Sequence, residues 1–167
     1  GEGVLGVVIG PRTLEESLHE ILAGGYSVSL FTMWADEGAH QMWVKTADEL
    51  DGRPYFGAPP AEEPRHPIAG ADPADCSDQL GVPGPSGERL PHFRLDFVPS
   101  SGDELQSEYL LPIADAAAAW AALRPMGAAL RDVLLVGEIR AVAADSMWLS
   151  LTGGQDCVAF HFTWVPD

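Results

Sequence analysis

The chain has 167 residues, enough for one domain, and 46% of them are hydrophobic, so it can bury a substantial core. Its net charge of −16 repels nucleic-acid phosphates and anionic membrane surfaces. No apolar run reaches the roughly 18 residues of a membrane-spanning helix, and Gly1-Glu2-Gly3 does not open a secretory signal. These features predict a cytoplasmic protein with one domain over residues 1–167 and no nucleic-acid partner.

Two further features concern metals and chain length. Cys76 and Cys157 lie far apart and lack the spacing of paired ligands, so the sequence predicts neither a metal site nor a disulfide. The chain stops at Asp167 directly after a strong strand pattern, whereas domains usually end in a frayed tail or a docked helix. We therefore expect the chain to be part of a larger protein.

The N-terminal third predicts a strand, a helix and a pair of strands. Leu5–Ile9 is an apolar run that favours a buried strand. Thr13 and Glu16 have the spacing of a capping box, which predicts a helix start at Thr13. The helix would bury Leu14, Leu18, Ile21 and Leu22 and end at Gly24-Gly25. Residues 26–32 and 41–45 alternate as two antiparallel strands joined by a turn.

Residues 48–87 differ in composition from the rest of the chain. They are rich in Pro, Gly, Asp and Ala, and they have few periodic apolar positions. A loop of this length inside a compact domain is usually functional or disordered, and we expect an ordered segment that covers the sheet. The histidines in or near irregular segments, His40, His66 and His92, are expected to be solvated or to tether loops, and none is predicted to be catalytic.

The C-terminal half predicts four more strands and a second helix. In residues 91–98, Phe93, Leu95 and Phe97 alternate with polar residues, which is typical of a half-buried strand. Residues 104–111 form the next predicted strand, with Gln106 on its polar side. Pro112 opens an alanine-rich helix to about Leu130, with Trp120 on its apolar side and a bend at Pro125. Strands are also predicted over 136–140 and 157–164.

The stretch Val136–Arg140 is the centre of the functional prediction. On a strand, Glu138 and Arg140 share one face, because successive side chains point to opposite sides. A carboxylate accepts hydrogen bonds and a guanidinium donates up to five, so together they match a ligand rich in hydroxyl groups. Thr163 lies on the small polar face of the last strand. An ordinary ion pair on a solvated sheet explains the same pattern, and periodicity alone does not separate the two interpretations.

Together the patterns predict an α+β fold, an antiparallel sheet of five or more strands with helices packed on one face. That face would hold Phe93, Phe97, Phe160 and Phe162 in one continuous layer. The opposite face would be polar and open.

Several short motifs, taken together and in order, resemble the FAD-dependent alditol oxidases. These enzymes are often named xylitol oxidases, and the sugar-lactone oxidases are more distant relatives. The motifs are Tyr26–Thr32, Gly81–Pro85, Glu88–Arg94, Pro99–Gly102, Glu104–Tyr109, Glu138–Asp145 and His161–Trp164.

The resemblance implies a fold, a cofactor and a site. It implies the substrate domain of a flavin oxidase of the vanillyl-alcohol-oxidase type, with the N-terminal FAD-binding domain and a C-terminal remainder absent from this chain. The full enzyme would oxidise a terminal CH–OH of xylitol or sorbitol with O2, giving an aldose and hydrogen peroxide. The polyol-binding residues would be Gln106, Glu138, Arg140 and Thr163, with Glu138 and Arg140 at the reacting end as the catalytic pair. The isolated chain is expected to be inactive and to bind no FAD.

Two departures from the family pattern affect the details of this prediction. Residues 85–88 are small where a tryptophan and a histidine are expected, and residues 151–154 replace a segment that carries proline, tyrosine and a basic residue. Three alternatives stay open: a non-catalytic polyol-binding module, a purely structural domain, and a sugar-1,4-lactone oxidase domain.

Overall fold

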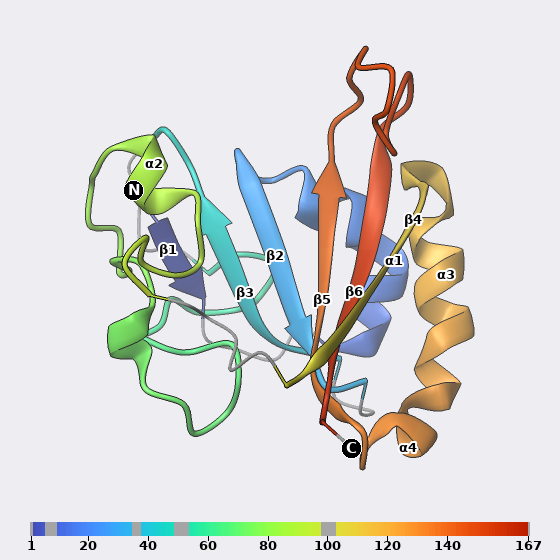
Figure 1. Ribbon diagram of the computed structural model, residues 1–167, viewed down its shortest axis with the longest axis horizontal. Helices are drawn as coiled ribbons and strands as arrows, with labels where there is room; N and C mark the ends of the chain where they lie inside the picture. The colour runs from blue at the N-terminus through green and yellow to red at the C-terminus, as the bar shows by residue number, and fades with distance from the viewer. Residues whose placement is uncertain (1, 6–9, 35–37, 49–53, 98–102, 167) are drawn as a thin grey trace.

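The protein is built on one six-stranded antiparallel sheet, shown in Figure 1. The computed structural model describes residues 2–5, 10–34, 38–48, 54–97 and 103–166, and only the backbone of residues 2–5 and 11. The strand order is β1-β3-β2-β5-β6-β4, and all neighbouring strands are antiparallel. The strands are β1 (Glu2–Leu5), β2 (Ser27–Thr32), β3 (Ala39–Lys45), β4 (Leu105–Pro112), β5 (Leu134–Val142) and β6 (Cys157–Trp164). The predicted α+β fold with five or more antiparallel strands is therefore confirmed.

Helices cover one face of this sheet, which we call the helix face. Helix α1 packs beside α3; in Figure 1, α1 lies behind β5 and β6, and α3 lies to the right of them. The helices are α1 (Pro11–Leu22), α2 (Ser86–Arg89), α3 (Ala116–Leu123) and α4 (Gly127–Leu130), with short 3-10 turns at Pro73–Asp75, Ile113–Asp115 and Arg124–Met126. The predicted bend at Pro125 is the 3-10 turn between α3 and α4, where proline cannot donate to the helix ladder.

The core on the helix face is dominated by stacked aromatic rings. Trp34 lies between Trp120 and Phe162, with ring centroids 4.9 and 5.7 Å away. A β-carbon on Gly137 would lie only 2.6 Å from the indole nitrogen of Trp34, so only glycine lets the ring approach β5 so closely. Ile139 and Phe160 complete this layer and are buried. The glycine next to Glu138 thus has a packing role on the opposite side of the strand.

The first helix starts earlier than the sequence predicted. It begins at Pro11, its N-cap is Gly10, and no side chain caps it, so the capping box at Thr13 and Glu16 is wrong. Proline at the first helical position has the right φ and lacks only an N–H that would be unpaired anyway. Leu14, Leu18, Ile21 and Leu22 are buried as predicted. The first strand is Glu2–Leu5, and residues 6–9 of the predicted strand lie outside the described residues.

The predicted strand over residues 91–98 is wrong. Residues 91–97 form turns with a single bridge between Phe93 and Cys76, and Leu95 is 77% exposed. Phe93 packs near Phe31 and Trp43, on the face opposite Phe160 and Phe162, so the four phenylalanines do not form one layer. The alternation of residues 93–97 reflects the packing of a loop on the sheet rather than a strand in it.

The second face of the sheet, which we call the site face, is only partly open. Residues 54–97, which we call the covering segment, lie over its β1–β3–β2 side and form a second small core. This core contains Phe31, Trp43, Cys76 and Val136, with Ala61, Ile68 and Phe93 packed against it. The expectation of an ordered segment is thus met over its described part, and the expectation of an open face is wrong on this side.

No helix in the described part of the chain has the length and apolar character that a membrane crossing needs.

Candidate functional site

Strand register brings the polar side chains of β4, β5 and β6 into adjacent rows on the site face. Glu138 on β5 pairs with His161 on β6, and His161 pairs with Glu108 on β4. One row along, Thr163 pairs with Gln106. Because strands have a period of two, these residues point to the same side as Arg140. Side chains that are up to 57 residues apart in the sequence therefore share one surface.

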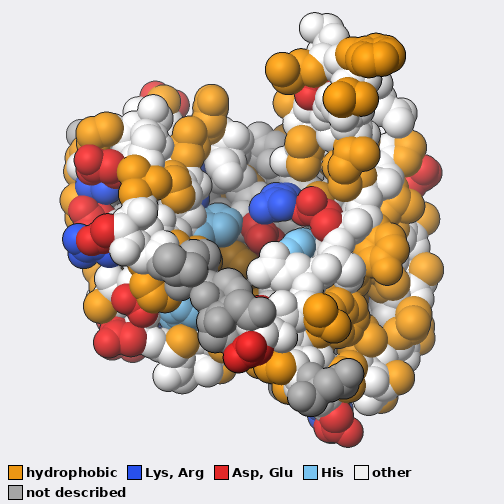
Figure 2. Space-filling model, viewed as in Figure 1, with side chains coloured by type: hydrophobic (Ala, Val, Ile, Leu, Met, Phe, Trp, Pro, Cys, Tyr) orange, Lys and Arg blue, Asp and Glu red, His pale blue; other side chains and the backbone are white. Residues whose placement is uncertain are grey.

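Of these residues, all but Glu108 line a pocket of about 290 Å³. Its floor is the sheet, and the covering segment supplies a side wall with Pro67, Ile68 and His92. Figure 2 shows acidic, basic and histidine side chains gathered in a hollow at the centre of this face. All four predicted site residues line it, namely Gln106, Glu138, Arg140 and Thr163. The volume is near the lower end of the roughly 300–1,000 Å³ of ligand pockets, which suits a small molecule.

Arg140 lies between two carboxylates. Its Nη2 donates to Glu108 Oε1 at 2.5 Å, and its Nη1 lies 3.6 Å from Glu138 Oε2. The side chain remains 38% exposed, so the guanidinium also faces solvent. A guanidinium has five N–H groups, and two carboxylate contacts leave donors for a ligand. The ion pair predicted from the sequence is present, but it is part of a pocket wall.

Glu138 is the buried acid of the pocket, with a side chain only 8% exposed. Burial alone would raise the pKa of Glu138, but contacts with His92, Arg140 and Ser29 outweigh burial and lower this pKa to about 2. The strongest of these contacts is the hydrogen bond from His92 Nε2 to Glu138 Oε1, at 3.1 Å. Glu138 is thus a fixed, ionised acceptor at neutral pH.

Gln106 and Thr163 offer neutral groups at the other end of the pocket. Within the described residues, neither the side-chain amide of Gln106 nor the hydroxyl of Thr163 makes a hydrogen bond to the protein. An amide both donates and accepts, and so does a hydroxyl. Gln106 is exposed and Thr163 is nearly buried, so the pocket deepens from β4 towards β6. The pocket thus combines a carboxylate, a guanidinium and two neutral polar groups within one small volume.

The structure places two histidines as the sequence predicted, as anchors of a loop, but gives His92 a role that the sequence did not predict. His40 donates through Nε2 to the Pro67 carbonyl, and His66 Nδ1 accepts from the Ile68 amide, so both stabilise the covering segment. His92 instead reaches the pocket and contacts Glu138. No periodicity predicts this contact, because it depends on how the covering segment folds over the sheet. The only available signal was its place on the polar side of residues 91–97.

The pocket does not fit a dinucleotide cofactor. FAD is much larger than a volume of about 290 Å³, and the two carboxylates that line the pocket, Glu104 and Glu138, would repel its phosphates. Metals also have no site within the described residues, where no three His, Cys, Asp or Glu side chains are grouped to hold an ion. In the part of the chain that the structure describes, the pocket therefore suits a ligand that is small, polar and not anionic.

Comparison with known proteins supports the resemblance drawn from the short motifs. No protein-family model matches the chain. Over 149 residues, 88% of its length, the chain is 50% identical to the alditol oxidase of Streptomyces sp. (strain IKD472 / FERM P-14339). The match covers 35% of that protein, so the chain spans about a third of the length of this relative. The predicted resemblance to the alditol oxidases is therefore confirmed, for the share of the relative that this chain spans.

Proposed function

We propose that this chain is the polyol-binding domain of an FAD-dependent alditol oxidase. The single observation that carries the proposal is the pocket, because the four residues implied by the resemblance line one volume of about 290 Å³. A polyol such as xylitol or sorbitol is small, neutral and rich in hydroxyl groups. Each hydroxyl both donates and accepts, which matches the carboxylate of Glu138, the guanidinium of Arg140 and the neutral polar groups of Gln106 and Thr163.

Each of the four residues has a proposed role. Glu138 accepts hydrogen bonds from substrate hydroxyls, and its low pKa keeps it ionised for this purpose. Arg140 donates to hydroxyls near the reacting carbon and polarises them, which its exposed edge permits. Gln106 and Thr163 hold the far end of the chain of hydroxyls. Their common task is to fix the reacting carbon in one orientation, because positioning accounts for much of the catalysis in such sites.

The oxidising group would come from outside this chain. The pocket in the described part of the chain does not fit FAD, so no residue of this pocket is assigned to the cofactor. We expect the 167-residue chain alone to bind no FAD and to oxidise no polyol. Absorbance in the flavin bands that survives dialysis of the purified chain, or peroxide formation by it, would contradict this expectation.

The test uses the longer protein that the proposal implies. The purified protein should show flavin absorbance and should produce hydrogen peroxide with xylitol and sorbitol. Sugar-1,4-lactones serve as competing substrates, because the lactone-oxidase alternative predicts faster turnover with them. Flavin absorbance without polyol turnover would reject the polyol proposal, and absence of flavin would reject the oxidase.

A matched pair of variants connects this activity to the pocket. Gln106→Ala should raise the KM for xylitol several-fold, because one neutral hydrogen bond contributes about 1 kcal/mol. Gln155→Ala is the control, since Gln155 is an exposed glutamine on the loop between β5 and β6 and does not line the pocket. Equal KM values for the two variants would place the polyol elsewhere.

A further inference from the structure

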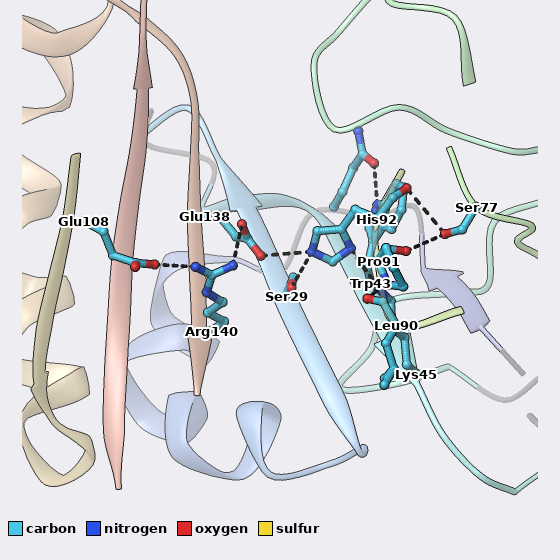
Figure 3. Close-up of polar contacts among 11 residues, drawn as sticks. Ser29, Trp43, Lys45, Ser77, Leu90, Pro91, His92, Glu108, Glu138 and Arg140 are labelled. Carbon is cyan, nitrogen blue, oxygen red and sulfur yellow. Dashed lines mark hydrogen bonds and ion pairs between the residues drawn. The ribbon is translucent and has the colours of Figure 1, made fainter. Parts of the chain in front are cut away.

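A continuous row of polar contacts runs across the sheet beneath the covering segment, as Figure 3 shows. It links residues of β3, the covering segment, β5 and β4, and we call it the polar row. Its members are Lys45, His92, Glu138, Arg140 and Glu108. Three of them line the pocket, whereas Lys45 and Glu108 lie at the two ends. The row therefore connects the buried side of the sheet to the proposed polyol site through one imidazole ring.

The contacts of His92 determine where its ring proton lies. Lys45 Nζ lies 3.0 Å from His92 Nδ1, and an ammonium group can only donate. Nδ1 must then accept, so the single proton of the neutral ring is on Nε2. Nε2 lies 3.1 Å from Glu138 Oε1 and 3.1 Å from the Ser29 hydroxyl, and of these two groups the carboxylate can only accept. Donor and acceptor thus alternate correctly from Lys45 to Glu138 in one tautomer only.

The ring is also held in place by its surroundings. Phe31 and Trp43 meet it edge to face, with centroids 5.5 and 5.2 Å away. The Ser77 hydroxyl donates to the Pro91 carbonyl at 2.8 Å, and the Ser77 amide donates to the His92 carbonyl at 3.1 Å. Both the side chain and the backbone of His92 are therefore fixed over the sheet.

We propose that His92 is a positioning residue, which fixes the Glu138 carboxylate through Nε2–H and is itself held in that tautomer by Lys45. With Oε1 bound to His92, the second oxygen of Glu138 faces Arg140, 3.6 Å away. The acid is then oriented before a ligand arrives, which lowers the entropic cost of binding. This inference rests on the proposed function in one respect, that Glu138 is the acceptor for polyol hydroxyls.

A purely structural role for His92 is the competing explanation. In that case the ring would only anchor the covering segment between Phe31 and Trp43. Glutamine and asparagine separate the two roles, because the glutamine amide can reach the position of Nε2 and the shorter asparagine amide reaches only that of Nδ1. His92→Gln therefore keeps the donor to Glu138, and His92→Asn loses it. His92→Phe keeps the ring packing but removes both nitrogen atoms.

The first experiment reads the tautomer directly. Long-range ¹H–¹⁵N NMR of the ¹⁵N-labelled 167-residue chain should show His92 protonated at Nε2 and unprotonated at Nδ1 at pH 7. Lys45→Met, which keeps the length of the side chain but removes the donor, should convert this signal to a mixture of tautomers. A wild-type ring protonated at Nδ1 would overturn the proposal, and so would a ring that is unchanged by Lys45→Met.

The second experiment measures the effect of His92 on Glu138. Contacts with His92, Arg140 and Ser29 lower the pKa of Glu138. His161 lies opposite Glu138 on β6, and Lys45 contacts the other side of the His92 ring. In His92→Asn the pKa of the Glu138 carboxyl, read from its ¹³C shift, should rise by about one unit, since a charge-assisted bond is lost. His92→Gln should leave the pKa close to wild type. Equal values in the two variants would overturn the proposal.

The third experiment uses the oxidase activity of the longer protein. His92→Asn and His92→Phe should raise the KM for xylitol about tenfold, and His92→Gln should stay within about threefold of wild type. Equal KM values for the glutamine and asparagine variants at similar thermal stability would overturn the positioning role. If wild type oxidised no polyol, the proposed function would fail, and the NMR experiments would still decide the role of His92.

Discussion

The two faces of the sheet are built by different rules. On the helix face, the residues of the core are buried and their contacts are apolar, so volume and shape determine which residues fit there. On the site face, polar groups lie between the open edge at β4 and the covering segment, and hydrogen bonds orient the two charged ones, Glu138 and Arg140. Substitutions on the helix face should therefore reduce stability, whereas substitutions on the site face should reduce substrate binding and turnover at nearly unchanged stability.

The largest expected effect lies on the helix face. Trp120 is fully buried against Trp34, and Trp120→Ala should lower the free energy of unfolding by about 3–5 kcal/mol through loss of contacts and the cavity left behind. Leu95→Ala is the control, because Leu95 is 77% exposed and should change stability by at most about 0.5 kcal/mol. Chemical denaturation of the 167-residue chain measures both. A large loss for Leu95→Ala would restore the strand predicted over residues 91–98.

The second largest effect is expected on the site face, where turnover should depend on the planar shape of the Arg140 guanidinium. Arg140→Lys keeps the charge but replaces a planar fork by a point charge that cannot contact Glu108, Glu138 and a polyol together. Turnover of xylitol by the longer protein should fall by roughly 10², and the thermal midpoint should change little. Near-normal turnover would mean that the charge alone matters.

A smaller effect is expected at the far end of the pocket. Thr163→Ala removes one hydroxyl from the pocket wall and should raise the KM for xylitol several-fold, because a neutral hydrogen bond contributes about 1 kcal/mol. Turnover at saturation should change less, since Thr163 lies away from the proposed reacting end. Thr163→Ser, which keeps the hydroxyl, should restore most of the affinity. A fall in turnover with an unchanged KM would contradict this assignment.

The smallest effect concerns pH and the covering segment. Burial lowers the pKa of His40, only partly offset by its bond to the Pro67 carbonyl, so the folded chain keeps this ring neutral. The unfolded chain then binds more protons than the folded chain below the ordinary histidine pKa of 6.5, and stability should fall as the pH falls through 6.5 towards the lowered folded pKa. His40→Gln should flatten this part of the profile of thermal midpoint against pH. An unchanged slope would mean that other groups cause it.

The same contrast explains what the sequence could and could not predict. Strands β2 to β6 and the helix face follow from alternation and from stripes such as Leu14 and Leu18, because these patterns report local geometry directly. The shared face of Glu138 and Arg140 follows from strand period alone. The same period put Gln106 and Thr163 on polar faces, and the family motifs implied that all four residues bind a polyol. The contact of His92 with Glu138 did not follow, since it depends on the long-range docking of the covering segment. The mistaken strand at 91–98 has the same cause.

The proposed binding of polyol in the polar pocket can be tested by comparing two arginines. Arg140 and Arg124 each pair with a glutamate, and each side chain is 38% exposed, but only Arg140 lines the pocket. Arg124 lies at the end of α3 and pairs with Glu15 of α1, on the other side of the sheet. The measurement is steady-state peroxide production from xylitol by the flavin-loaded longer protein carrying Arg140→Ala or Arg124→Ala. We expect turnover to fall by a factor of roughly 10² or more in Arg140→Ala and to stay unchanged in Arg124→Ala. Near-normal turnover in Arg140→Ala would contradict it and leave Glu138 and Arg140 as an ordinary ion pair on a sheet.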